Sequence, residues 1–179
     1  MAAEIITVDD FEQKIVTKED FIKTADNVII LFDASISMNE THINSGKSRY
    51  DLAKTFLEDG NNRLPDLGYN IGIYLYTPWT SIYPMQSYDK VKVAAALQSL
   101  PDKPEGVTYL VEGLKNLKPI LENLSGRTVV FLFTDGSYMK TDVREPSYYA
   151  KELAENYDIC FYIISSANNK VNQQMLEKV

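Results

Sequence analysis

Two acidic residues in this sequence each stand directly after a strongly apolar run. Asp33 follows the run 28–32, and Asp135 closes a second run of the same design. Two hydroxyls follow the first acid at every second position, Ser35 and Ser37. Carboxylate and hydroxyl oxygens are hard ligands, which suit Mg²⁺, Mn²⁺ or Ca²⁺ better than zinc. These residues predict a divalent cation site if the fold brings the two segments together.

A third segment offers one more hydroxyl. A loop that contains Gly106 leads to Thr108 at the start of a predicted helix, and Gly136 supplies a turn after Asp135. Asp and Ser after a strand are also ordinary helix caps and turn formers. Capping alone explains poorly a set of two strand-end acids, a serine pair and a loop threonine.

The elements that must position these side chains follow from the apolar pattern. The branched-rich run 28–32 is typical of a strand buried on both faces of a parallel sheet. Strands that alternate with amphipathic helices predict βαβ units with right-handed crossovers, and so an α/β fold with three layers and a doubly wound, mostly parallel sheet. The predicted strands are 28–33, 69–76, 128–134 and 158–165, and the predicted helices are 47–63, 88–100, 108–121, 146–157 and 169 onward.

One further strand is expected to run antiparallel. The turn 77–80 is too short for a crossover, so 81–86 must return beside its neighbour, and Pro84 suits an edge strand. The hairpin extends the sheet to one side of the first strand, and the later βαβ units extend it to the other. Asp33 and Asp135 then flank the topological switch point, where α/β sheets hold their ligands.

Trp79 and Tyr83 lie on this hairpin, whose turn is expected at the same end of the sheet as the two acids. Trp and Tyr are common anchors of protein interfaces, so an aromatic rim that contacts a partner is one hypothesis. Ordinary packing within the hairpin is the other.

Length and composition limit the classes of function. The chain has 179 residues and a net charge of −7, which fits one domain and argues against nucleic acid as a partner. The single His42 and the single Cys160 exclude a His-based metal site, a Ser-His-Asp triad and an internal disulfide. We find no apolar stretch of membrane-spanning length and no signal-peptide pattern.

The order and spacing of Asp33-x-Ser35-x-Ser37, Thr108 and Thr134-Asp135-Gly136 resemble the metal-ion-dependent adhesion site of von Willebrand factor type A domains. The resemblance covers 27–179, with 1–26 expected as an arm packed on the domain. It implies that one coordination position of the metal stays open for a Glu or Asp of a protein partner. The family usually has Gly between the two serines. Ile36 stands there in this chain and is expected to affect the loop and its metal affinity.

A narrower resemblance concerns the segments 18–26 and 64–69. They are similar to type A domains of bacterial envelope proteins that carry an OmpA-like peptidoglycan-binding domain. This resemblance implies a periplasmic or outer-membrane-associated location and an OmpA-like domain downstream. Because the sequence stops inside a predicted helix, we also expect the domain to be truncated at its C-terminal end.

The function predicted from these features is binding without catalysis, since no strong general base or activated nucleophile stands beside the oxygen set. Two alternatives remain open. One is a metal-free scaffold domain of a larger envelope protein. The other is a Mg²⁺-dependent aspartyl phosphatase with Asp33 as nucleophile, although such enzymes need a second Asp at the position of Ser35.

Overall fold

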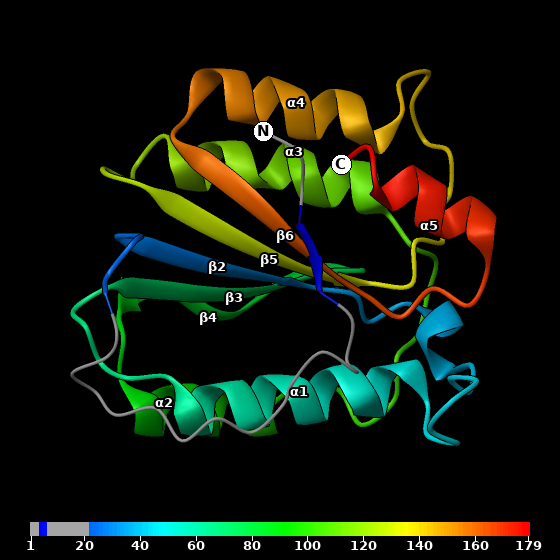
Figure 1. The fold of residues 1–179 in the computed structure, drawn as a ribbon, viewed down its shortest axis with the longest axis horizontal. Coiled ribbons are helices and arrows are strands. Elements are labelled where there is room, and N and C mark those ends of the chain that lie inside the picture. Colours follow the sequence, from blue (N-terminus) through cyan, green and yellow to red (C-terminus); the bar gives the residue numbers. More distant parts are fainter. Residues whose placement is uncertain (1–3, 7–21) are drawn as a thin grey trace.

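A computed structural model of the chain, which describes residues 4–6 and 22–179, has three layers with a sheet in the middle (Figure 1). The strand order is β1-β6-β5-β2-β3-β4, and only β4 among these pairs antiparallel with its neighbour. The predicted α/β class and the antiparallel edge strand are confirmed. The strands are β1 (Glu4–Ile6), β2 (Asn27–Phe32), β3 (Asn70–Tyr76), β4 (Trp79–Ser87), β5 (Thr128–Thr134) and β6 (Ile159–Ser165).

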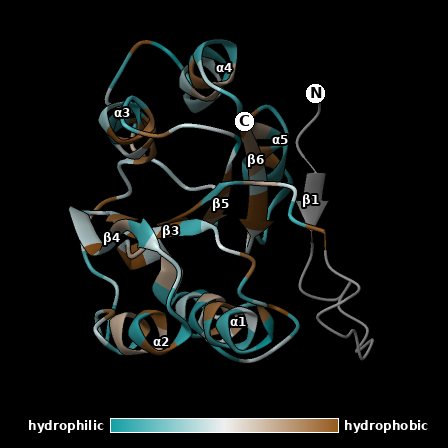
Figure 2. Cartoon of the chain, turned by 90° about the vertical axis from the view of Figure 1, so that its left-hand side faces the viewer, coloured by the Kyte–Doolittle hydropathy of each residue, from teal (hydrophilic) through white to brown (hydrophobic). Residues whose placement is uncertain are grey.

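Helices cover both faces of the sheet. Figure 2 shows α1 (Arg49–Arg63) and α2 (Lys90–Gln98) on one face, with α3 (Leu110–Leu121) and α4 (Pro146–Asn156) on the other. The short helix α5 (Lys170–Leu176) follows β6 and packs on the α3–α4 side through Leu176. A single 3-10 turn, η3 (Ile36–Asn39), lies between β2 and α1.

The central strand β2 supplies side chains to two separate cores. Because successive strand residues point to opposite faces, Ile29 and Leu31 join the core under α3 and α4. Ile30 and Phe32 join the core over α1 and α2. All four side chains are at most 7% exposed, which confirms the prediction of a strand buried on both faces.

The arrangement of β2 determines where the acids lie. This strand pairs in parallel with β3 on one side and β5 on the other, so the chain winds away from it in both directions. The two acids follow β2 and β5 directly, and the Asp33 N–H donates to the Phe133 carbonyl at 3.0 Å. Asp33 and Asp135 therefore stand at the switch point, as the order of elements predicted.

Only part of the predicted N-terminal arm is described. Its strand β1 pairs in parallel with β6 at the edge of the sheet. Residues 1–3 and 7–21 lie outside the described residues, so the packing of the arm as a whole stays a prediction. Within the described ranges, no helix has the length and apolar character needed to cross a membrane.

Candidate functional site

The three hydroxyls predicted as ligands converge from two loops. The Thr108 Oγ1–H donates to Ser35 Oγ at 2.7 Å, and Ser35 Oγ lies 3.0 Å from Ser37 Oγ. The loops that carry them are joined by the backbone, because the Ile36 N–H donates to the Gly106 carbonyl at 3.0 Å. Ser35 is fully buried, and Thr108 is 5% exposed. The fold thus builds one hydroxyl cluster from segments more than 70 residues apart, since the Thr108–Ser35 bond spans 73 positions.

Asp33 is fully buried and orients the serine loop. Its Oδ1 accepts the Ser35 N–H at 2.9 Å, and its Oδ2 accepts the Tyr76 O–H at 2.6 Å and the Thr134 O–H at 3.3 Å. Burial raises the pKa of Asp33 to about 6, although the hydrogen bonds from Ser35 and Tyr76 act in the opposite direction. One carboxylate oxygen therefore holds the serine loop, and the other is bonded to the ends of β3 and β5.

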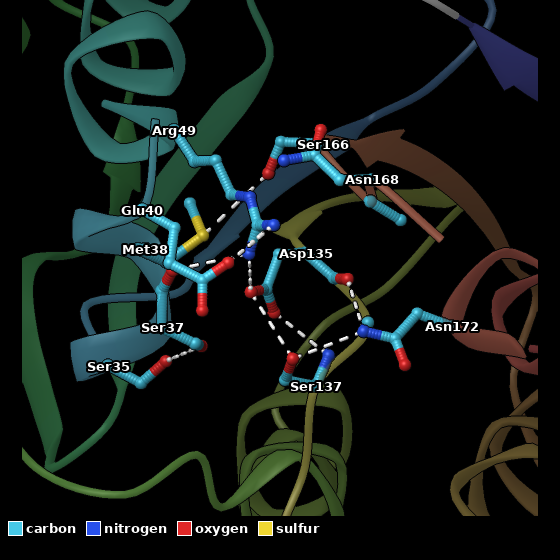
Figure 3. A network of polar contacts seen from close by, with 12 residues as sticks. Ser35, Ser37, Met38, Glu40, Arg49, Asp135, Ser137, Ser166, Asn168 and Asn172 are labelled. Atoms are coloured by element: carbon cyan, nitrogen blue, oxygen red, sulfur yellow. Dashed lines mark hydrogen bonds and ion pairs between the residues drawn. The ribbon is translucent and has the colours of Figure 1, made fainter. Parts of the chain in front are cut away.

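Asp135 is also fully buried, and its main partner is an arginine (Figure 3). Its Oδ2 accepts from Arg49 Nη1 at 2.5 Å, and its Oδ1 accepts the Ser137 N–H at 2.8 Å. The same Nη1 donates to the Ser37 carbonyl at 3.2 Å, and Arg49 Nη2 lies 2.9 Å from a carboxylate oxygen of Glu40. Arg49 therefore connects Asp135 to the serine loop.

The short helix α5 secures the loop that follows Asp135. Asn172 Nδ2 donates to the Asp135 carbonyl and to Ser137 Oγ, each at 3.1 Å (Figure 3). Gly136 has a φ of 74°, and a Cβ there would lie 2.9 Å from Asn172 Cβ. The turn predicted at Gly136 is confirmed, and its missing side chain leaves room for α5.

This donor set fits a divalent cation. Three hydroxyl oxygens meet at one place. Of the two buried carboxylates, Asp33 bonds to the Ser35 backbone, and Asp135 is linked to the Ser37 backbone through Arg49. Hydroxyl and carboxylate oxygens are the hard ligands that Mg²⁺, Mn²⁺ and Ca²⁺ prefer. Nowhere in the described part of the chain do three or more His, Cys, Asp or Glu side chains form a cluster suited to a metal. That finding does not conflict with the predicted set, because hydroxyls outnumber carboxylates in it.

Four neighbours of the site were missed by sequence reasoning: Arg49, Tyr76, Ser137 and Asn172. Arg49 did carry a signal. It is the first residue of α1, directly after the N-cap Ser48, where the helix dipole disfavours a cation. A cation in that position indicates a compensating anion elsewhere. The other three carried no signal that we recognise.

Ile36, which replaces the usual glycine, is accommodated by the backbone. Among the described residues only glycines have a positive φ, so this position does not require the left-handed conformation. The Ile36 side chain is 64% exposed. Its expected influence on metal affinity stays a prediction.

The two aromatic residues predicted to form a rim, Trp79 and Tyr83, differ in their exposure. Tyr83 is 6% exposed and belongs to the core on the α1–α2 face, as ordinary hairpin packing predicts. A contact between Tyr83 and a partner stays a prediction. Trp79 is partly buried and stacks on Tyr74, with ring centroids 5.3 Å apart. A contact between Trp79 and a partner stays a prediction.

The fold is similar to several solved structures with low sequence identity. One is proximal thread matrix protein 1 from the mussel byssus with a zinc-occupied MIDAS motif (TM-score 0.61, 18% identity, 85% of this chain and 44% of that chain). Another is the manganese-loaded TRAP protein of Plasmodium vivax (TM-score 0.60, 18% identity, 83% and 61%). A third is an aerotolerance-related membrane protein from Bacteroides fragilis with multiple mutations to serines (TM-score 0.59, 15% identity, 78% and 66%).

In each of these cases the chain spans less than two thirds of the solved structure. A comparison with curated proteins finds no match. The family model for the von Willebrand factor type A domain matches residues 27–179, from the start of β2 to the last residue of the sequence. The chain therefore belongs to the von Willebrand factor type A domain family.

Proposed function

We propose that this domain binds a divalent cation and uses it to hold a carboxylate of a protein partner. Ser35, Ser37 and Thr108 would hold the cation, and Asp33 and Asp135 would supply negative charge beside it. The observation that carries the proposal is the convergence of the three hydroxyls, with separations of 2.7 and 3.0 Å. When bound, a cation with only partly neutralised charge supplies strong attraction for a Glu or Asp side chain.

Two solved relatives support the cation, since their structures are described as manganese-loaded and as holding zinc in a MIDAS motif. For this chain we favour Mg²⁺, Mn²⁺ or Ca²⁺, because all of the proposed ligands are oxygens. Binding requires no catalysis. A phosphatase would need Asp33 as nucleophile, and that carboxylate is fully buried with both oxygens hydrogen-bonded, which places it poorly for attack on an ester.

The proposed location is the bacterial cell envelope. The likeness to a membrane protein of Bacteroides fragilis and the similarity of 18–26 and 64–69 to envelope proteins support it. The proposal of an OmpA-like domain downstream is supported by the sequence resemblance. In this setting the domain would act as an adhesion or assembly module whose partner presents an acidic side chain.

A titration with a matched pair of variants tests whether the proposed hydroxyl ligands bind a cation. In isothermal calorimetry, metal-stripped protein is expected to bind Mg²⁺ and Mn²⁺ with saturation, and Thr108→Val is expected to weaken that binding by about tenfold or more. Valine keeps the shape of threonine and removes only the hydroxyl. Thr55→Val makes the same change on the exposed face of α1 and should bind like the wild type.

The outcome also separates the proposal from the scaffold alternative. A metal-free scaffold predicts no saturable heat with either cation and no difference between the two variants. Equal binding by Thr108→Val and the wild type would place the cation elsewhere in the molecule and contradict the proposed ligand set.

A further inference from the structure

The site contains a permanent positive charge that belongs to the chain itself. The Arg49 side chain is 5% exposed and the Asp135 side chain is fully buried, so their contact at 2.5 Å is shielded from water. The second acidic partner of Arg49, Glu40, has a side chain that is 66% exposed. Exposed ion pairs contribute little, whereas a buried charge without its partner is costly. Asp135 is therefore the partner that balances the charge of Arg49.

The position of Arg49 in α1 strengthens this argument. As the first helical residue it stands at the positive end of the helix dipole, which is an unfavourable place for a cation. The helix dipole gives no reason for a positive charge at this end. Its guanidinium instead contacts Asp135 after β5 and the Ser37 carbonyl in η3. One side chain thus ties together two of the loops that carry the predicted ligands.

We propose that Arg49 is a built-in counter-ion of Asp135, which keeps the metal-free site assembled and lowers the affinity of that site for a divalent cation. The proposal has two halves. The counter-ion half states that Arg49 balances Asp135 and keeps the metal-free site assembled. The affinity half states that Arg49 lowers the affinity for a cation, and only this half rests on the proposed function. A cation that approaches Asp135 meets a carboxylate whose charge is already balanced, and it is repelled by the guanidinium. Arg49 is a positioning residue in this scheme and is not proposed as a ligand.

A thermal double-mutant cycle in the presence of a chelator tests the counter-ion half. Arg49→Gln leaves the buried Asp135 charge unbalanced and is expected to lower the melting temperature by about 6–20 °C. Adding Asp135→Asn removes that charge, so the double variant should melt higher than Arg49→Gln alone. Arg63→Gln, at the exposed end of the same helix, should stay within about 2 °C of the wild type.

The result that would overturn this half is simple additivity. If the double variant loses as much as the two single variants combined, Arg49 and Asp135 act independently, and the arginine contributes only packing.

Calorimetric titration with Mg²⁺ tests the affinity half. Folded Arg49→Gln is expected to bind the cation about tenfold more tightly than the wild type, because a nearby positive charge is gone. Arg49→Lys retains the charge and should remain close to the wild type. Unchanged or weaker binding by folded Arg49→Gln would refute this half.

The two experiments distinguish the possible failures. If neither the wild type nor Arg49→Gln binds a cation, the proposed function and the affinity half both fail. The counter-ion half is then still decided by the melting temperatures, which are measured without metal.

Discussion

At the scale of single residues, the site depends on which groups donate hydrogen bonds to the two buried acids. Asp33 accepts from the Ser35 backbone and from Tyr76, so it fixes the loop in which Ser35 offers its hydroxyl. The burial that makes these hydrogen bonds strong also penalises the ionised carboxylate. The protonation state of Asp33 should therefore couple the site to pH.

The pH dependence has a defined sign. Burial raises the pKa of Asp33 from 3.8 to about 6 in the folded protein. Because the folded state holds this proton more tightly than the unfolded chain, the stabilisation is complete below about pH 4 and is lost as pH rises through about 6. The full effect amounts to about 3 kcal/mol. Melting temperatures in chelator from pH 4 to 8 should show the wild type losing stability relative to Asp33→Asn.

Asparagine resembles the protonated acid and does not titrate, so the comparison cancels the contributions of other groups. A difference between the two proteins that stays constant from pH 4 to 8 would mean that Asp33 does not titrate in this window.

At the scale of secondary-structure elements, α3 packs closely against β3 at Tyr76, the residue whose O–H donates to Asp33. Gly113 in α3 makes this possible, since a Cβ there would lie 2.6 Å from Tyr76 Cβ and 3.0 Å from Tyr76 Cγ. Both of these atoms lie close to the backbone of β3, so they have little freedom to move. The contact links helix packing directly to the geometry of the site.

Gly113→Ala is accordingly expected to destabilise the domain, although alanine is the better helix former by about 1 kcal/mol. Overpacking of this kind costs about 1–3 kcal/mol, and we expect a net loss of about 1 kcal/mol in urea unfolding. Gly60→Ala in α1 is the matched control. A Cβ at Gly60 meets no atom within 4 Å, so that variant should gain up to about 1 kcal/mol. Stabilisation by both substitutions would show that α3 can shift away from β3.

At the scale of the whole molecule, the site joins loops that follow β2 and β5 to the loop that precedes α3. The strands β2 and β5, which precede two of these loops, each contribute side chains to both cores. A ligand that binds only when all three loops are in place must stabilise the folded state as a whole.

Metal addition should therefore raise the melting temperature. At 100 times the dissociation constant, the linkage amounts to about 2.7 kcal/mol, or about 5–11 °C for a domain of this size. Differential scanning calorimetry with Mg²⁺ and with excess chelator provides the measurement. Thr108→Val, titrated at the same Mg²⁺ concentrations, should show a smaller shift. A shift of the same size in both proteins would indicate cation binding outside the proposed site.

The sequence by itself determined most of the architecture and the identity of the oxygen set. The apolar run of β2, its alternation with helical segments and the short turn before β4 each encode a local preference, and all three predictions are confirmed. Boundaries differ by one or two residues, as for α1, where the N-cap Ser48 accepts the Asp51 N–H and starts the helix at Arg49. Strand-end acids and loop hydroxyls are also visible locally, because motif spacing is a property of the chain.

Only the tertiary structure decided which side chains hydrogen-bond to those groups and which charges balance them. The Tyr83 side chain lies in the core on the face of the sheet that α1 and α2 cover, so its burial depends on elements other than its own strand. The Arg49–Asp135 contact spans 86 positions, and the Tyr76–Asp33 contact spans 43. No local pattern specifies such pairs, because nothing in the helix or strand that carries one partner identifies the residue it will contact. The unfavourable place of Arg49 in α1 is a signal for an anion, but it does not name Asp135. Their meeting follows from the strand order, which places β2 between β3 and β5 and brings α1 against the loop that follows β2.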